Sequence, residues 1–354
     1  MTFFSACKRG GKLTGGEPAY VSAQQVNLRD RLAAVYNKRG VVKNGDRVEV
    51  LEKSKRFVRV RTANGEEGWM EARYLVGPEV FDSFSALEKD NAASSVQARG
   101  ITRTDLNMHV SPGRETEHLY RIAGNTKLDI LKRAVAEKPG PARPGSLKPA
   151  AAASAGAEKT ANAPAEVPPP QLEDWLLVRD PQQRHTGWVL ARMVDIDVPL
   201  EIAQYAEGQR IMASFVLNQV KDYKDDQARD VPQYLVLVNE PKDGMPFDFN
   251  QLRVFTWNTK RHRYETAYRE RKLEGFFPVQ VGHEVFDKEG DLPFFVVRTK
   301  DDSGNILEKK YKLNGPIVRR VLSSEEQQKA AAEKAARRAA APPRKAQSRR
   351  RGRR

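Results

Sequence analysis

Cysteine is nearly absent from this chain. The 354 residues include one cysteine, Cys7, and only five histidines. A single thiol excludes a disulfide within the chain and excludes a zinc site built from cysteines. The histidines lack the short spacing of a metal-binding pair, and they are His109, His118, His185, His262 and His283. We therefore expect no disulfide framework, no metal and no other cofactor.

Long apolar runs are also absent. No stretch approaches the ~18 apolar residues that a membrane-spanning helix requires. The hydrophobic fraction is 39%, and two segments account for part of this low value. Residues 137–171 consist largely of Pro, Ala, Gly and Ser, and the tail from Ser323 offers only Ala as an apolar residue. Neither segment has the large apolar side chains that would offset the entropy lost on folding.

Recognisable catalytic motifs are missing as well. The sequence contains no Gly-rich phosphate loop of standard spacing, no H-E-x-x-H and no G-x-S-x-G. Cys7 precedes every predicted folded element, which argues against a nucleophile paired with a histidine base. The carboxylate pairs Asp225-Asp226 and Asp301-Asp302 fall in polar stretches typical of turns. We expect a protein that is not an enzyme.

Positive charge is present but concentrated at one end. The net charge is +15, and the tail from Ser323 holds eleven basic and three acidic residues, which is about half of that charge. A cationic tail of this kind binds anionic lipid headgroups or wall polymers, binds nucleic acid, or stays solvated. The charge alone leaves these alternatives open.

The first residues, MTFFSACKRGGK, resemble the end of a bacterial lipoprotein signal. Small residues, Ser5 and Ala6, precede Cys7, and a polar, Gly-containing tether follows it. In such proteins the cysteine carries the lipid. The apolar stretch before Cys7 is far shorter than the 7–15 residues of a signal. We expect lipid attachment at Cys7 if the signal begins further upstream, and a free thiol otherwise.

Residues 19–80 show the pattern of short strands joined by tight turns. Asn44-Gly45 and Asn64-Gly65 are hairpin-type pairs. Between them, Val58 and Val60 alternate with arginines, as expected for a strand with one buried face. The segment lacks a helical period, so we expect a small antiparallel barrel.

The pattern occurs twice. GWMEARYL at residues 68–75 returns as GWVLARMV at residues 187–194, and Gly45 and Phe57 correspond to Gly124 and Trp175. The intervals between corresponding residues agree in the two copies except for one. Gly124 and Trp175 are further apart than Gly45 and Phe57, by about the length of the Pro/Ala-rich segment. We therefore predict a second barrel at residues 99–197, with residues 137–171 inserted at a hairpin tip, where extra length costs little.

These residues resemble bacterial SH3 (SH3b-type) domains in two copies. The match rests on Val26-Asn27-Leu28-Arg29, Gly45-Asp46, Val48–Leu51, Gly68-Trp69 and Tyr74-Leu75, and it is weaker in the second copy. The resemblance implies small barrels of the kind found in exported or envelope proteins. There they contact cell-wall peptide or glycan, or accompany a wall hydrolase.

Candidate ligand-binding residues are aromatic or basic positions of the two barrels. They are Arg59, Arg61, Trp69, Tyr74, Trp175 and Trp188. We expect the tryptophans, with Phe57, to pack mainly in the cores. Outward Arg59, Arg61 and Tyr74 would form a shallow basic groove for an anionic or peptide ligand. The alternative is that the arginines form a solvated face.

The expected fold is mainly β: two small SH3-like antiparallel barrels and a C-terminal antiparallel β domain, either a sheet or a sandwich. The expected divisions are a tether at 1–18, a first barrel at 19–80, a second at 99–197, a mainly β domain at 198–322 and an Ala-rich helix with an Arg-rich tail at 323–354. The segment 201–220 is compatible with a helix or a strand.

Two functions follow from this reading. The favoured one is a non-catalytic binding or scaffolding protein of the cell envelope, periplasmic or lipid-anchored at the bilayer through Cys7, with a cell-wall polymer or an envelope protein as partner. The alternative is a soluble cytoplasmic protein that contacts nucleic acid through its Arg-rich tail. The sequence leaves the oligomeric state open.

Overall fold

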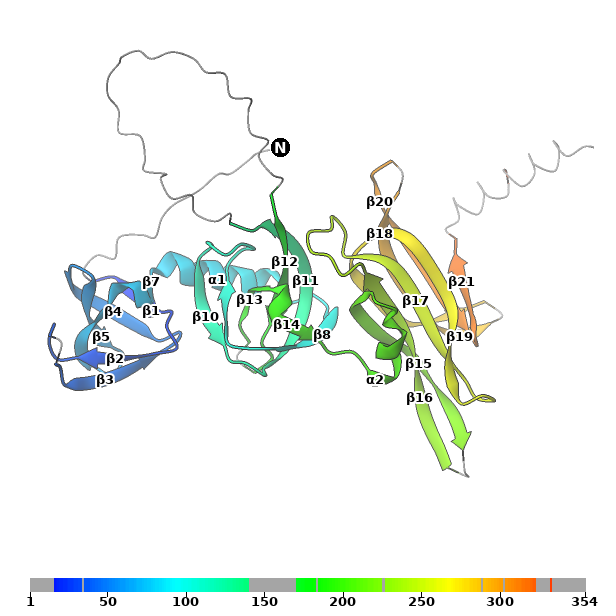
Figure 1. Ribbon diagram of the computed structural model, residues 1–354, viewed down its shortest axis with the longest axis horizontal. Coiled ribbons are helices and arrows are strands. Elements are labelled where there is room, and N and C mark those ends of the chain that lie inside the picture. Colours follow the sequence, from blue (N-terminus) through cyan, green and yellow to red (C-terminus); the bar gives the residue numbers. More distant parts are fainter. Residues whose placement is uncertain are drawn as a thin grey trace, which may run out of the picture. The chain divides into compact units, whose positions relative to one another are not determined.

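The computed structural model describes residues 16–33, 35–139, 170–182, 184–224, 227–287, 289–301, 303–322 and 332. These residues form three seven-stranded antiparallel sheets with two short α-helices (Figure 1). The mainly β prediction is therefore confirmed. Cys7, the Pro/Ala-rich insertion from 140 to 169 and the Arg-rich tail lie outside the described residues.

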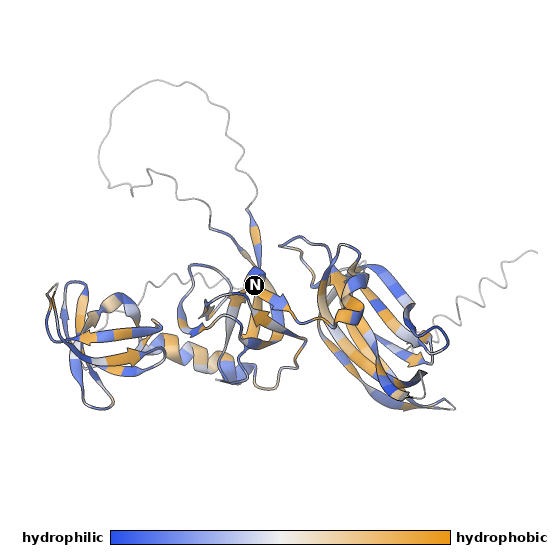
Figure 2. Cartoon of the chain, turned by 60° about the horizontal axis from the view of Figure 1, so that its bottom comes forward, coloured by the Kyte–Doolittle hydropathy of each residue, from blue (hydrophilic) through white to orange (hydrophobic). Residues whose placement is uncertain are grey.

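The first sheet is built from residues 18–76 in the order β3-β2-β6-β5-β4-β1-β7. Its strands are β1 (Pro18–Val21), β2 (Gln25–Arg29), β3 (Lys38–Lys43), β4 (Arg47–Ser54), β5 (Phe57–Thr62), β6 (Glu67–Glu71) and β7 (Leu75–Val76). The alternating valines predicted from the sequence, including Val48, Val50, Val58 and Val60, form its core with Leu28. Apolar and polar residues alternate along such strands (Figure 2).

The second sheet repeats this arrangement strand for strand. Its order is β10-β9-β13-β12-β11-β8-β14, which corresponds position by position to that of the first. Its strands are β8 (Ala98–Thr102), β9 (Leu106–His109), β10 (His118–Ile122), β11 (Lys127–Glu137), β12 (Leu172–Arg179), β13 (Thr186–Leu190) and β14 (Val194–Ile196). In both sheets a short 3₁₀ helix, Ala72–Tyr74 or Ala191–Met193, follows the GW strand.

Helix α1 (Pro78–Asp90) joins the two barrels and buries Val80 and Phe84. Its Phe81 stacks on Tyr20 of β1 with ring centroids 4.1 Å apart, and Phe84 meets Tyr120 of β10 edge to face. Asn44 completes the junction. Its amide nitrogen donates to the carbonyl oxygen of Leu119 at 2.7 Å, and its amide oxygen accepts from the Arg121 backbone N–H at 2.9 Å.

The third sheet is a seven-stranded meander in chain order. It contains β15 (Arg210–Lys224), β16 (Gln227–Asn239), β17 (Phe249–Asn258), β18 (Arg263–Phe286), β19 (Gly290–Lys300), β20 (Ile306–Asn314) and β21 (Ile317–Val321). A single helical turn, α2 (Leu200–Ala203), and a 3₁₀ turn at Gln204–Ala206 precede it. The segment 201–220, for which the sequence was compatible with a helix or a strand, thus contains both, and most of it is strand.

Two compact units share this third sheet. One includes the first two sheets, up to Phe215, with Leu235–Arg253 and Arg269–Pro278, and the other contains Val216–Tyr234, Val254–Tyr268 and the residues from Val279. In the second unit Phe295 stacks on Tyr311 at 4.9 Å, and both rings are buried. The hairpin predicted around Gly304 is confirmed by the pairing of Lys300 with Ile306.

Candidate functional site

Each of the first two barrels has a surface groove at the same place in its fold. Groove 1 has a volume of about 340 Å³, and its lining includes Asn27, Arg29, Tyr36, Glu71, Tyr74 and Arg121. Groove 2 has a volume of about 440 Å³, and its lining includes Asn107, His109, Arg114, His118, Trp175 and Arg192. Arg121 lines both grooves.

The duplicated strands explain why the grooves correspond. Asn27 and Arg29 on β2 occupy the positions of Asn107 and His109 on β9, and each groove is closed by the 3₁₀ helix that follows the GW strand. Tyr74 in one groove therefore corresponds to Met193 in the other. The fold supplies the same concave surface twice, and the side chains give the two copies different chemistry.

Groove 2 is lined by more arginines than carboxylates, next to a buried tryptophan. Trp175 is only 2% exposed and meets the His109 ring edge to face at 5.1 Å. Arg114, Arg121 and Arg192 line the groove, whereas Asp105 supplies the one lining carboxylate. Behind the surface, the half-exposed Arg114 donates from Nε to the buried carboxylate of Glu173 at 2.7 Å. Arg192 lies 3.6 Å from the same carboxylate.

Burial favours the neutral form of the two histidines of groove 2. Burial lowers the pKa of His109 and His118 below the ordinary value of 6.5. Their rings lie 5.4 Å apart, and Nδ1 of His109 is 3.0 Å from the hydroxyl oxygen of Thr116. That hydroxyl lies 2.7 Å from the Gly113 carbonyl oxygen, to which it donates. It is thus held by the loop as well as by the histidine.

Groove 1 is aromatic and cationic through stacked pairs. The guanidinium of Arg29 lies 4.3 Å from the centre of the Tyr36 ring, and that of Arg73 lies 4.7 Å from the Tyr74 ring. Arg73 also donates to the Tyr74 hydroxyl at 2.7 Å and pairs with Glu71 at 2.9 Å. The aromatic faces of Tyr36 and Tyr74 in groove 1 are therefore partly covered by neighbouring arginines, Arg29 and Arg73.

The inward packing predicted for Phe57, Trp69 and Trp188 is wrong. Phe57 is only partly buried, and the guanidinium groups of Arg29 and Arg56 lie 5.5 and 5.1 Å from its ring centre. On β6 the inward positions belong to Gly68 and Met70, and on β13 to Gly187 and Val189, so each tryptophan lies half-buried on the outer face. The cause is the period of two along a strand, which puts neighbours of an inward residue outside. Neither tryptophan is among the residues lining either groove.

The remaining predicted residues divide between the grooves and an ion-paired surface. Trp175 is buried as expected and lines groove 2, while Tyr74 lines groove 1. Arg59 and Arg61 instead pair with Glu67, at 2.7 and 2.8 Å. The structure does not bring Arg59 or Arg61 to either groove, and Cys7 is not among the described residues.

Sequence reasoning missed several lining residues of groove 2, among them Asn107, His109, Arg114, His118 and Arg192. One pattern in the sequence indicated the position of His109. Met108-His109 stands where the first copy has Leu28-Arg29, and alternation turns Met108 inward and His109 outward. Arg114 and His118 carried no such indication, because they reach the groove from the β9–β10 loop and the start of β10.

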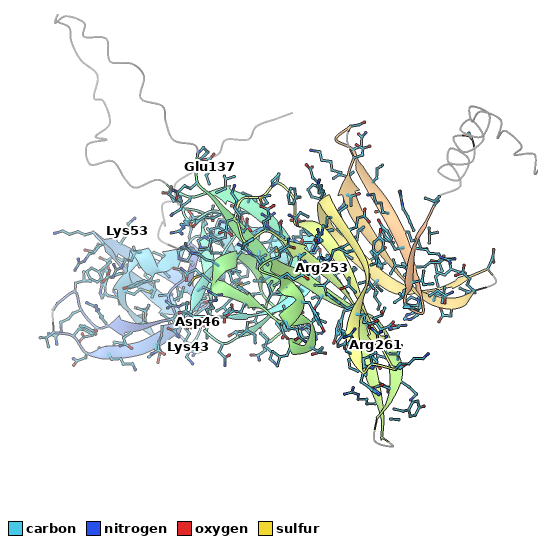
Figure 3. All side chains as sticks on the ribbon, turned by 45° about the vertical axis from the view of Figure 1, so that its right-hand side comes forward. Lys43, Asp46, Lys53, Glu137, Arg253 and Arg261 are labelled. Carbon is cyan, nitrogen blue, oxygen red and sulfur yellow. The ribbon has the colours of Figure 1, made fainter. Side chains whose placement is uncertain are left out.

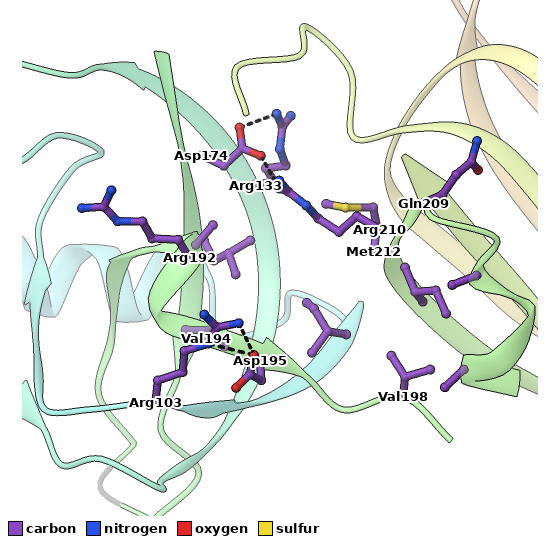
Figure 4. Close-up of a pocket in the computed structure, with 16 residues that line it drawn as sticks. Arg103, Arg133, Asp174, Arg192, Val194, Asp195, Val198, Gln209, Arg210 and Met212 are labelled. Carbon is purple, nitrogen blue, oxygen red and sulfur yellow. Dashed lines mark hydrogen bonds and ion pairs between the residues drawn. The ribbon is translucent and has the colours of Figure 1, made fainter. Parts of the chain in front are cut away.

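A third cavity, of about 460 Å³, lies beside the β11–β12 hairpin (Figure 4). Its charged groups pair with one another. Asp174, 2% exposed, accepts from Arg133 at 2.7 Å and from Arg210 at 3.2 Å, and Arg103 pairs with Asp195. The Gly244 backbone N–H also donates to Asp174 at 2.8 Å. This network connects the hairpin to the β16–β17 loop. Most charged groups of the cavity are therefore already paired within the protein and not available to a ligand.

Among the described residues no group of histidine, cysteine and carboxylate side chains is arranged to hold a metal ion. None of the helices in the same part of the chain is both long and apolar enough to cross a membrane.

The chain contains a bacterial SH3 domain, since residues 25–76 match the family model of that name. The match covers β2 to β7, the strands that shape groove 1. The likeness of the second copy rests on its strand order and on the repeated GW segment.

Solved structures similar to the chain include an NlpC/P60 family protein from Bacillus cereus ATCC 10987, 12% identical with a TM-score of 0.22. That match covers 57% of this chain and 65% of the Bacillus chain, slightly under two thirds of its length. Another is NlpC2 from Trichomonas vaginalis, 9% identical with a TM-score of 0.17, covering 89% of this chain and all of that one. No curated protein matches the chain.

Proposed function

We propose that this chain is a non-catalytic binding protein of the bacterial cell envelope, and that groove 2 holds a carboxylate-bearing peptide of the cell wall. The observation that carries the proposal is the set of three arginines in this groove, which outnumber the two carboxylates they pair with, Glu173 and Asp105. A bacterial SH3 domain at residues 25–76 is consistent with this setting.

The chemistry of groove 2 fits a short acidic peptide. Guanidinium groups bind carboxylates through paired N–H donors. The amide of Asn107 offers a donor and an acceptor to a peptide backbone, and the partly exposed Leu106 and Leu190 offer apolar contact to an aliphatic side chain. Neutral His109 and His118 add hydrogen-bonding groups without further charge.

A binding role is favoured over catalysis by the composition of this groove. Its lining contains no cysteine or serine, and the Thr116 hydroxyl next to His109 donates to the loop backbone. An activated nucleophile would need its proton directed to the histidine.

The test is titration of the full chain with a soluble wall stem peptide that carries free carboxylates. Arg192 is 53% exposed, so Arg192→Gln should fold normally and weaken binding about tenfold, the worth of one hydrogen bond to a charged group. The control is Arg99→Gln, which removes an arginine of the same barrel that is 79% exposed and lies outside the groove lining. Equal affinity for the peptide and its fully amidated form would refute the carboxylate assignment.

A further inference from the structure

The loop between β2 and β3, residues 30–37, carries two large apolar side chains that the barrel leaves exposed. Val35 is 83% exposed and Leu32 is 43% exposed. A single exposed apolar side chain is ordinary on a protein surface, but these two lie on either side of the middle of one loop. We call Leu32 and Val35 the apolar tip of the β2–β3 loop.

The base of this loop is closed by hydrogen bonds. The Asp30 backbone N–H donates to the Asn37 carbonyl oxygen at 3.1 Å, and the Asn37 backbone N–H donates to the Asp30 carboxylate at 2.8 Å. The Asn37 amide nitrogen donates to the same carboxylate at 3.1 Å. Tyr36 packs on Arg29, whose guanidinium lies 4.3 Å from the ring centre. The ends of the loop are therefore held by the barrel, while Val35 stays exposed.

The second barrel shows that the shared fold does not require an apolar tip. Its β9–β10 loop, residues 110–117, has the same length, and its first N–H donates to its last carbonyl oxygen at 2.9 Å, as in the first barrel. At the position of Val35 this loop has Glu115. At the position of Leu32 it has Pro112. The apolar tip is therefore a feature of the first barrel and not of the fold that both barrels share.

Cations flank the apolar tip. Arg31 within the loop is 63% exposed, and Lys38 and Arg39 are exposed at the start of β3. The carboxylates nearby are Asp30, which is 15% exposed at the base of the loop, and Glu66, which reaches β3 from the β5–β6 turn. From β1 to β7 the first barrel contains twelve basic and seven acidic residues, a net charge of +5. The apolar tip is thus part of a positively charged barrel.

From these features we propose that the β2–β3 loop binds the first barrel to an anionic lipid bilayer. Leu32 and Val35 leave water for the boundary between headgroups and acyl chains, and the flanking cations face the lipid phosphates. A stable interface with a protein buries about 800 Å² on each side, more than two side chains supply, whereas a fluid bilayer needs no matching shape. The inference goes beyond the function proposed for groove 2 and does not depend on it.

The test is co-sedimentation of the full chain with vesicles of phosphatidylcholine and phosphatidylglycerol in equal parts. The chain is prepared without a lipid on Cys7, because an attached acyl chain would itself bind the vesicles. We expect binding to the mixed vesicles and about a hundredfold weaker binding to pure phosphatidylcholine, since three cations near an anionic surface each contribute to the affinity. Added salt should weaken binding to the mixed vesicles.

Two pairs of variants test the named side chains. Val35→Glu, which introduces the side chain type that the second barrel has at this position, should fold normally and weaken binding to mixed vesicles about tenfold. Its control is Val285→Glu in the third sheet, where Val285 is 76% exposed. Lys38→Gln should weaken binding about fivefold. Its control is Lys43→Gln at the other end of β3, beside Asp46, and little effect is expected there (Figure 3).

A gain of binding is also expected. Val35→Trp should bind the mixed vesicles more tightly, because tryptophan favours the membrane interface. Equal affinity for the two kinds of vesicle, or unchanged binding in Val35→Glu, would overturn the proposal. Loss of retention on purified wall polymer in Val35→Glu, without vesicle binding by the parent chain, would assign the loop to the wall instead. Arg192→Gln should leave vesicle binding unchanged, so this proposal and the peptide-binding function of groove 2 fail independently.

Discussion

Gly68 and Gly187 permit a close approach of two strands in each barrel. A Cβ atom at Gly68 would lie 2.7 Å from Cβ of Leu28, and one at Gly187 would lie 2.8 Å from Cβ of Met108. Both contacts are with the first side-chain carbon of the facing residue, which cannot rotate away. The glycine of the GW pair is therefore required by strand packing, and it serves the same purpose in both copies.

Gly68→Ala and Gly187→Ala should each destabilise the protein by about 1–3 kcal/mol, the usual cost of overpacking a core. Urea denaturation followed by fluorescence measures the loss. Gly40→Ala is the control, because a Cβ there meets the far end of the flexible Glu66 side chain and lies 3.6 Å from Leu28 Cδ1. Equal stability of the Gly68 and Gly40 variants would contradict the argument.

The histidines of groove 2 predict a pH dependence of stability. Burial lowers the pKa of both histidines. A hydrogen bond with the Thr116 backbone opposes this shift at His109, and the negative charge of Glu117 opposes it at His118. Because the folded pKa lies below the ordinary value of 6.5, the unfolded chain binds protons first. This contribution to stability is complete above pH 6.5 and is lost as the pH falls below it.

The melting temperature should accordingly fall between pH 7 and pH 5, and His109→Gln/His118→Gln should reduce the slope. His283→Gln, which alters an exposed side chain, serves as control. A slope that is the same in the double variant and the parent would show that other groups cause the dependence.

At the scale of elements, the β11–β12 hairpin depends on a buried ion pair. Arg133 and Asp174 are 3% and 2% exposed, and Asp174 also accepts from Arg210 and from the Gly244 N–H. A buried pair contributes little net stability, but loss of one partner leaves the other charge uncompensated.

Asp174→Asn keeps the shape of the side chain and leaves Arg133 with the more distant carboxylate of Asp248, at 3.4 Å, so it should cost about 1–3 kcal/mol. The control is Glu49→Gln, whose partner is Arg61 on the surface, with both side chains 46% exposed, and no measurable change is expected there. Thermal or urea denaturation of both variants checks the difference. A small effect of Asp174→Asn would mean that water reaches Arg133.

Strands and hairpins were largely predictable, because alternation and Asn-Gly turns act over a few residues. The valines of β4 and β5, the repeat and the hairpin at Gly304 all follow from such local patterns. The grooves were not predictable to the same degree. Their lining joins residues far apart in the chain, such as Arg114 and Trp175. The large size of Trp69 and Trp188 suggested core positions, whereas the alternation along their strands turns both outward.

At the scale of the molecule, the two barrels are joined by direct contacts. Asn44 bonds to the backbone of Leu119 and Arg121, α1 packs on both barrels, and Arg121 lines both grooves. On the proposed function, a wall polymer with repeated peptides contacts both grooves at once. Joined sites gain from a high effective concentration, which raises apparent affinity by about 10²–10⁴.

Binding to insoluble wall polymer should therefore exceed binding to a single stem peptide. Tyr36→Ala, which removes the ring stacked on Arg29 in groove 1, should weaken polymer retention but not peptide binding in groove 2. Combined with Arg192→Gln, it should reduce polymer retention to the level of the background. Co-sedimentation with purified wall material at fixed salt measures both effects. If Tyr36→Ala alone leaves retention unchanged, groove 1 takes no part in binding, and the first barrel supports the second through α1 and Asn44.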